Sequence, residues 1–409
     1  MLVQTLKGFR DFLPEQARKR QYVINTLKDV FSSYGFEPLE TPALEYEEIL
    51  TGKYGDEGDK LMYRFEDNGG RRVALRYDQT VPLARVVAQY QNELPTPFKR
   101  YQIQPVWRAE NTQRGRFREF LQCDIDITGL ASALADAEIL AIIADSYSVL
   151  GFKNFKILIN DRTLFSKMPS IKEKELPIVI RAIDKIKKIG REKVLEEIIA
   201  NGISPERATA FLQTIESQKP TAMIQDILTA TKQLGIPEEK IEFIPTLARG
   251  LDYYTGIIIE VEIDGYSVGS VGGGGRYDNL IGMFAGKQIP AVGFAFGFDR
   301  IIEALEEQKL FPTDLSNTKV LVTIFSPDLL NQAIEASYQL RASDITTELY
   351  LDPNAKMEKQ LKYADQKNIP YVIIIGSDEA EKNLLTIKNL KTREQKKATL
   401  DEVIKELQG

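Results

Sequence analysis

Residues 98–129 of this 409-residue chain read FKRYQIQPVWRAENTQRGRFREFLQCDIDITG. Two strand-like runs, Tyr101–Arg108 and Glu119–Thr128, flank a polar, glycine-containing loop, and this pattern predicts an antiparallel hairpin. The hairpin carries charges of both signs, at Arg108, Glu110, Arg114, Arg116, Arg118, Glu119, Asp124 and Asp126. We therefore expect the fold to be organised around a β-sheet with a charged site on it.

The charges of this hairpin favour a nucleotide as the ligand. Alternate residues of a strand share a face, so Arg108 and Glu110 would point the same way. A guanidinium group suits phosphate oxygens, a carboxylate can accept from an amino group, and Phe120 could stack on a flat base. The alternative is a hairpin that is merely cross-linked by surface salt bridges.

Two further segments carry chemistry. Leu247–Gly256, LARGLDYYTG, places Arg249 close to the adjacent Tyr253 and Tyr254, whose rings and hydroxyls could bind a polar aromatic ligand or could equally be core residues. Gly269–Asp278, GSVGGGGRYD, precedes a glycine-flanked helix that contains Arg300. Four glycines allow close approach of a ligand, and between strands they favour a nucleotide or amino-acid cradle over a plain loop.

A fourth segment, Leu75–Pro82, contains Asp78 and Thr80 two positions apart. In an extended chain the two side chains would face the same way and suit an ammonium group. The alternative is that one of them caps the helix expected at residues 81–91.

Composition excludes several kinds of chemistry. The chain has no histidine and a single cysteine, Cys123, so it cannot form a Ser-His-Asp triad, a histidine or cysteine-cluster metal site, or an intrachain disulfide. No apolar run reaches the roughly 18 residues of a membrane span. We expect a soluble, cytoplasmic protein with no membrane partner and no metal site of its own.

The patterns along the chain predict an α+β organisation. Helices are expected at 15–33, 134–150 and 297–308, and a helical insertion at 163–243. Further strands are expected at 61–65, 73–77, 257–263 and 266–271, the last two joined at Asp264-Gly265. From 319 to 376 a βαβαβ alternation predicts a separate small α/β domain.

With these segments in view, the chain resembles the class II aminoacyl-tRNA synthetases, and among them the histidyl-tRNA synthetase family. The resemblance spans the chain: Leu6–Pro14 resembles the amino-terminal signature, and Phe36–Pro42, Phe98–Asp126 and Gly293–Arg300 resemble motifs 1, 2 and 3. RGLDYY and GGGGRYD match the two segments specific to the histidine enzymes. The resemblance implies an antiparallel catalytic core (1–162 and 244–311), a helical insertion (163–243) and an α/β anticodon-binding domain (318–409).

The resemblance also implies roles for individual residues. Arg108, Arg249 and Arg300 would be catalytic, and ATP would be bound by Arg108, Glu110, Arg116, Phe120 and Arg300. Histidine would be bound by Asp78, Thr80, Gln122, Asp126, Arg249, Tyr253, Tyr254 and Tyr277. Asp78 and Asp126 stand where other branches of the family have glutamate.

The implied reaction is activation of L-histidine by ATP with Mg²⁺, followed by transfer to tRNA(His), in a homodimer formed through motif 1. Arginines and metal ions stabilise the charge in such a reaction, so the absence of protein histidines is compatible with it. One alternative is a non-aminoacylating relative, the regulatory subunit of the first histidine-biosynthesis enzyme. Another is a class II synthetase for threonine, proline or glycine.

Overall fold

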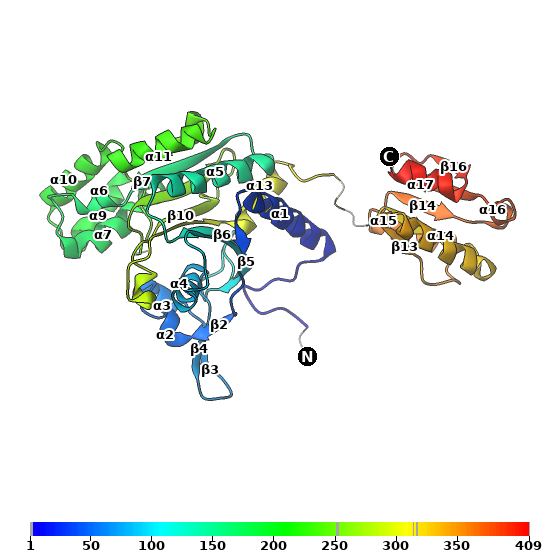
Figure 1. The fold of residues 1–409 in the computed structure, drawn as a ribbon, viewed down its shortest axis with the longest axis horizontal. Helices are drawn as coiled ribbons and strands as arrows, with labels where there is room; N and C mark the ends of the chain where they lie inside the picture. Colours follow the sequence, from blue (N-terminus) through cyan, green and yellow to red (C-terminus); the bar gives the residue numbers. More distant parts are fainter. Residues whose placement is uncertain (1–2, 251–252, 314, 316–317, 409) are drawn as a thin grey trace. The chain divides into compact units, whose positions relative to one another are not determined.

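The computed structural model describes residues 3–250, 253–313, 315 and 318–408, and its chain divides into two compact units, Met1–Phe311 and Pro312–Gly409 (Figure 1). Leu251 and Asp252 of the RGLDYY segment lie outside the described residues, as do Ser316 and Asn317 of the polar linker that the sequence predicts before the βαβαβ segment. None of the described helices is long and apolar enough to cross a membrane.

The described part of the first unit is built on an eight-stranded, mainly antiparallel sheet in the order β1-β5-β6-β11-β10-β9-β7-β8. Only the outer pairs, β1 with β5 and β7 with β8, are parallel. The strands are β1 (Glu37–Pro38), β5 (Phe98–Trp107), β6 (Glu119–Thr128), β7 (Phe155–Asp161), β8 (Ile241–Phe243), β9 (Ile257–Ile263), β10 (Gly272–Arg276) and β11 (Ala291–Phe296). The antiparallel core sheet implied by the family resemblance is confirmed.

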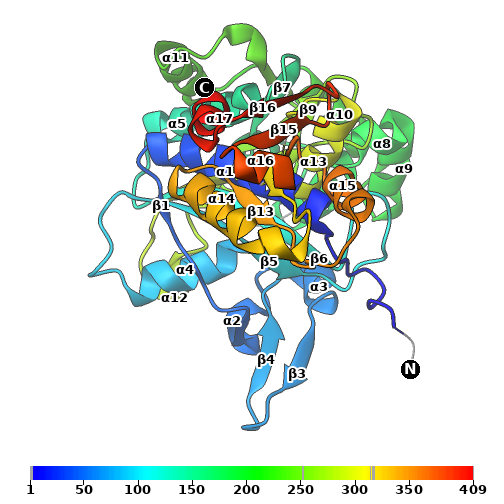
Figure 2. The same ribbon diagram turned by 90° about the vertical axis from the view of Figure 1, so that its right-hand side faces the viewer.

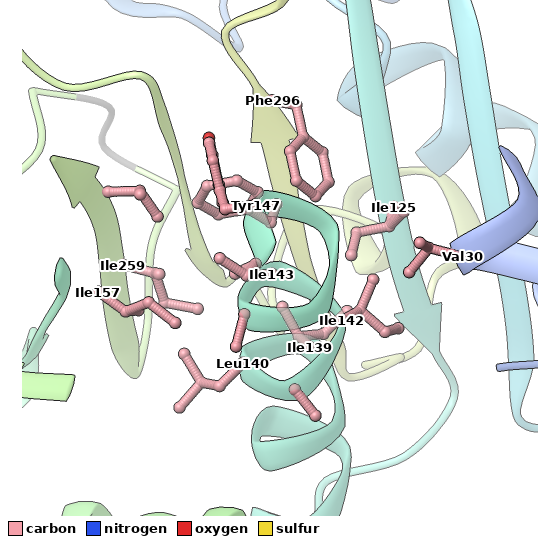
Figure 3. Close-up of a cluster of buried hydrophobic side chains, with 14 of the residues drawn as sticks. Val30, Ile125, Ile139, Leu140, Ile142, Ile143, Tyr147, Ile157, Ile259 and Phe296 are labelled. Carbon is pink, nitrogen blue, oxygen red and sulfur yellow. The ribbon is translucent and has the colours of Figure 1, made fainter. Parts of the chain in front are cut away.

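One face of this sheet is covered by helices α1 (Pro14–Ser33), α5 (Ala133–Val149) and α13 (Phe298–Glu307). Helix α5 begins where the Ser132 hydroxyl accepts from the Leu134 amide, a normal N-cap. It is apolar almost all round because it packs between the sheet and other helices (Figure 3). Alternation along the strands directs Ile125, Ile157 and Ile259 towards this helix, and it leaves the other face of the sheet for polar side chains.

A three-stranded sheet, in the order β2-β4-β3, stands apart from the main sheet. The β3–β4 hairpin projects from the rest of the first unit in both views (Figures 1 and 2). The elements of this region are β2 (Leu44–Tyr46), α2 (Glu47–Leu50), α3 (Gly55–Lys60), β3 (Arg64–Glu66), β4 (Arg72–Leu75), α4 (Thr80–Gln89) and α12 (Gly282–Ala285). The strand expected at 61–65 therefore begins three residues later, at Arg64.

Between β7 and β8 the chain is helical: α6 (Thr163–Ser166), α7 (Leu176–Ile183), α8 (Ile186–Ile189), α9 (Arg191–Ala200), α10 (Pro205–Glu216) and α11 (Ala222–Gln233). Helices α7, α9 and α10 share a core of their own. Helix α11 instead contributes Ile224 and Ile227 to the core around α5, and β8 belongs to the main sheet. The domain limits 163–243 remain a prediction.

The glycine run is the largest difference between the expected and observed strands. A strand was expected at 266–271 with the glycines after it, but Gly272–Gly275 themselves form most of β10 and pair with both β9 and β11. Residues 264–271 form the connection, which starts with a turn at Asp264-Gly265. The prediction misplaced this strand because glycine has a low strand propensity: it has no side chain to pack and is depleted in strands.

The second unit has a five-stranded sheet in the order β13-β12-β14-β15-β16, parallel across β13, β12 and β14 and antiparallel beyond. Apolar clusters on both of its faces make it an α/β unit. Its elements are β12 (Val320–Val322), α14 (Leu330–Ala342), β13 (Thr347–Leu349), α15 (Met357–Gln366), β14 (Tyr371–Ile374), α16 (Ser377–Glu381), β15 (Leu385–Asn389), β16 (Gln395–Ala398) and α17 (Leu400–Gln408).

Candidate active site

A cavity of about 430 Å³ lies over the polar face of the central strands of the first unit. The structure brings all thirteen predicted site residues together around it, although they come from segments far apart in the sequence. They are Asp78, Thr80, Arg108, Glu110, Arg116, Phe120, Gln122, Asp126, Arg249, Tyr253, Tyr254, Tyr277 and Arg300.

Strand β6 supplies the floor of the cavity. Its even-numbered residues Phe120, Gln122, Asp124 and Asp126 line the cavity, whereas its odd-numbered residues Cys123, Ile125 and Ile127 are buried in the apolar core around α5. This division follows from the two-residue period of a strand. The sheet thus separates a polar binding face from the core.

Asp126 is held by two partners. Its Oδ2 atom lies 2.7 Å from a guanidinium nitrogen of the fully buried Arg100, and its Oδ1 accepts from the Tyr277 hydroxyl. Burial raises the pKa of Asp126 to about 6, although Arg100 and Tyr277 both favour the ionised form. The side chain is therefore fixed in orientation at the bottom of the cavity.

The pairing of Arg100 with Asp126 gives a stability prediction. Arg100→Met should lower the free energy of unfolding by about 3–5 kcal/mol, because it leaves a buried carboxylate without its counter-charge. Denaturant titration followed by the fluorescence of Trp107, the only tryptophan, measures this in the first unit. Adding Asp126→Asn to this variant should restore part of the lost stability. A loss of only about 0–1 kcal/mol in Arg100→Met, as for surface ion pairs, would contradict a buried Arg100–Asp126 pair.

Glycines make room for the charged and aromatic side chains of the cavity. A Cβ atom on Gly273 would lie 1.6 Å from a guanidinium nitrogen of Arg249, and one on Gly293 would lie 1.9 Å from Asp126 Oδ1. The glycine segment is therefore a cradle, as its position between strands indicated, but a cradle built from strand rather than loop.

Arg249 and the tyrosines form one wall. The Arg249 guanidinium donates to Glu260 Oε1 at 3.2 Å, and it lies 5.7 Å from the centroid of the Tyr254 ring. The Tyr253 ring is 4.8 Å from that of Tyr254 and 6.0 Å from that of Tyr277. These rings lie next to a buried carboxylate, an environment that suits a flat, polar ring.

Arg108 lies just beyond the strand that was expected to carry it. Strand β5 ends at Trp107, so Arg108 and Glu110 are not fixed by strand alternation. Instead Arg108 Nε donates to the Tyr77 carbonyl at 3.0 Å, and its guanidinium carbon lies 4.4 Å and 5.1 Å from the centroids of Tyr77 and Phe120. Glu110 lies 3.4 Å from Arg116 at the exposed rim.

Asp78 and Thr80 are not in an extended chain, because Thr80 is the first residue of α4. Asp78 Oδ1 accepts from the Val81 amide at 3.1 Å and from the Tyr54 hydroxyl at 2.8 Å. The helix-capping alternative therefore holds for Asp78, which nevertheless lines the cavity. Burial raises its pKa.

Arg300 is carried by the first turn of α13 and donates to the Ser270 carbonyl at 2.5 Å. Several cavity residues were not among the predicted site residues, and Tyr77, Asp124 and Glu260 are three of them. Strand alternation from Gln122 to Asp126 could have identified Asp124. Tyr77 and Glu260 carry no such signal, because Tyr77 lies between β4 and α4, outside any strand, and the place of Glu260 depends on the pairing of β9 with β7 and β10.

Comparison with known proteins agrees with this fold and site. The sequence model of histidyl-tRNA synthetase matches residues 8–301, and that of an anticodon binding domain matches 319–409. A histidine–tRNA ligase of Cytophaga hutchinsonii is 42% identical over 98% of both chains. The crystal structure of histidyl-tRNA synthetase from Nostoc sp. PCC 7120 superposes with a TM-score of 0.87 at 31% identity, covering 100% of this chain and 99% of that one.

The fold alone is shared more widely. A Bacillus halodurans structure, described as an ATP phosphoribosyltransferase regulatory subunit/histidyl-tRNA synthetase, has a TM-score of 0.73 at 22% identity, covering 88% of this chain and 96% of that one. An antiparallel sheet with this arginine-rich cavity, followed by an anticodon-domain match, defines an aminoacyl-tRNA synthetase of class II. Within that class, the chain belongs to the histidyl-tRNA synthetase family.

Proposed function

We propose that this chain is a histidine–tRNA ligase, which activates L-histidine with ATP and transfers it to tRNA(His). The observation that carries the proposal is the cavity itself, whose lining combines the guanidinium groups of four arginines with tyrosines and buried carboxylates. Such a cavity can hold a triphosphate beside an amino acid with a polar ring. The anticodon-domain match over 319–409 favours the ligase over a regulatory subunit.

In the proposed first step, a carboxylate oxygen of histidine attacks the α-phosphorus of ATP, and the bond to pyrophosphate breaks. Arg108 and Arg249 would stabilise the charge that develops on the α-phosphate, and Arg300 and Arg116 would face the rest of the triphosphate. Glu110 would accept from the adenine amino group while Phe120 stacks on the ring. All six side chains line the cavity, which supports these roles.

The amino acid would lie deeper in the cavity. Asp78, Thr80 and Gln122 would hold its α-ammonium group, and Asp126, Tyr253, Tyr254 and Tyr277 would bind its imidazole. In the second step the terminal hydroxyl of the tRNA attacks the carbonyl carbon of histidyl-adenylate, AMP leaves, and the hydroxyl proton is released.

Mg²⁺ is part of this proposal as the ion that accompanies ATP. Its chemistry is to neutralise part of the phosphate charge. MgATP remains an anion, so the guanidinium groups of Arg108, Arg116 and Arg300 fit it. We further propose a homodimer formed through Phe36–Pro42 and a cytoplasmic location, where tRNA is charged.

The proposal includes a division of labour along the chain. Residues 1–162 and 244–311 would form the catalytic core, 163–243 the helical insertion, and 318–409 the anticodon-binding domain. The second of the two compact units, Pro312–Gly409, supports the last of these limits.

ATP–pyrophosphate exchange tests the proposed function. The purified protein should catalyse exchange that depends on L-histidine, with other amino acids about 100-fold or more less effective, because buried polar groups left unpaired by a wrong side chain disfavour it. Exchange without histidine dependence, or with a preference for threonine, proline or glycine, would refute the assignment. Absence of any exchange would favour the alternative that the protein is a regulatory subunit.

A further inference from the structure

Asp124 lies in the middle of the cavity floor and has no role in the proposed function. It stands between Gln122 and Asp126 on the polar face of β6, lines the cavity, and is only 3% exposed. Buried carboxylates in proteins are normally paired, so the hydrogen-bond partners of Asp124 indicate whether it is available to a ligand.

The partners of these three side chains differ. Asp126 is held by Arg100 and Tyr277, whereas Asp124 Oδ2 accepts only from the Gln122 side-chain amide, at 3.0 Å. Within the described residues, Asp124 Oδ1 and Gln122 Oε1 are buried acceptors with no hydrogen-bond partner. Two such atoms carry a desolvation penalty that a ligand donor would relieve.

The sheet register leaves the space on the β11 side of Asp124 open, whereas on β5 the fully buried Gln102 lies opposite Asp124. The cross-strand neighbour of Asp124 on β11 is Ala295, and the neighbour of Ala295 on β10 is Gly273. Neither residue has a side chain beyond Cβ, and Arg249 occupies the space above Gly273. The Asp124 carboxylate therefore faces the cavity, across from Arg249.

The charges around Asp124 favour a cationic ligand. Burial raises the pKa of Asp124 well above its usual range; Arg100 opposes this, and the nearby Asp126 and Asp78 add to it. A positive charge placed between Asp124 and Asp78 would reverse that effect. A neutral imidazole offers one N–H, whereas an ammonium group offers three from a single nitrogen and can reach two adjacent acceptors.

We propose that Asp124 and Gln122 together accept hydrogen bonds from the α-ammonium group of the amino-acid substrate, which makes Asp124 a further substrate-binding residue. This inference rests on the proposed function, because it assigns a group of the histidine substrate to a particular part of the floor. Asp126, already oriented by Tyr277, is left for the imidazole end.

The test compares two ligands in the Asp124→Asn variant. The KM for L-histidine in ATP–pyrophosphate exchange should rise about 10- to 100-fold, the usual worth of a hydrogen bond to a charged group, while the KM for ATP stays within about twofold. The inhibition constant of 3-(imidazol-4-yl)propionate, which lacks the ammonium group, should stay within about threefold. Thermal stability without ligand should be kept or increased, since the change removes a buried acid with an unpaired oxygen.

Asp126→Asn is the matched control on the same strand, and it should weaken the des-amino inhibitor as well as histidine. An equal loss for both ligands in Asp124→Asn, or an unchanged KM for histidine, would overturn the assignment of Asp124. Either result would leave histidine-dependent exchange by the wild-type protein intact, so the proposed function is judged separately.

Discussion

Replacing Arg249 by alanine should slow histidine-dependent ATP–pyrophosphate exchange by about 100-fold or more, because one charge that stabilises the transition state is lost from a partly buried site. The guanidinium lies in the cavity wall and is oriented by Glu260 at 3.2 Å. Single-turnover formation of histidyl-adenylate measures the effect directly. The fold should be unaffected, because Arg249 lines a cavity rather than filling the core.

Arg191→Ala provides the control for this change. Arg191 is an exposed arginine in α9, paired with Glu216, and its loss should leave the exchange rate unchanged. Circular dichroism and thermal unfolding of both variants separate catalytic loss from unfolding. A near-normal rate of adenylate formation in Arg249→Ala would remove this residue from the catalytic set.

Gly273→Ala should slow the same reaction by about 100-fold, although it removes no charged group. The added Cβ would sit 1.6 Å from an Arg249 guanidinium nitrogen, so the guanidinium must move, and a displacement of about 1 Å can cost that much. The end of a long side chain can move easily, so stability should change little. Pre-steady-state adenylate formation and thermal unfolding measure the two effects.

The mechanism of the Gly273→Ala effect can be isolated by a double variant. If the methyl group acts through Arg249, adding Gly273→Ala to Arg249→Ala should cost little more than Arg249→Ala alone. Gly274→Ala is the steric comparison: its Cβ would lie 2.1 Å from the Gly293 carbonyl oxygen, which is backbone, so this variant should lose stability. Additive losses in the double variant would contradict the assigned route.

Local sequence patterns predicted those parts of the fold that local physics controls. The helix expected at 134–150 from an amphipathic pattern is α5, Ala133–Val149, although it is buried on nearly all sides. The hairpin of β5 and β6 followed from its strand-forming residues, although the alternation expected for Arg108 and Glu110 does not apply because β5 ends at Trp107. The elements β15, β16 and α17 were not predicted. For β16 the reason is its lysine-rich sequence at 395–398, which has the composition of a solvated surface.

The assembly of the cavity depends on contacts that no local pattern encodes. Asp78, Arg249 and Arg300 meet because β6, β11, β10 and β9 pair in an order unlike their order in the chain. Only the family resemblance could group these residues beforehand. The prediction of the glycine strand failed for a related reason: its glycines are explained by Arg249 packing over Gly273 and by the close approach of neighbouring backbone at Gly274 and Gly275, and not by the strand's own propensity.

The burial of Cys123 has a practical consequence. This thiol lies beneath the cavity floor, fully enclosed by the core, and burial raises its pKa well above the usual range, so it should resist alkylation in the folded protein. Because it is the chain's only cysteine, thiol reagents should label the folded wild-type protein very little. Cysteines introduced at exposed positions of each unit could carry a pair of fluorophores in the otherwise unaltered protein, and energy transfer between them would report whether their separation changes when tRNA is added.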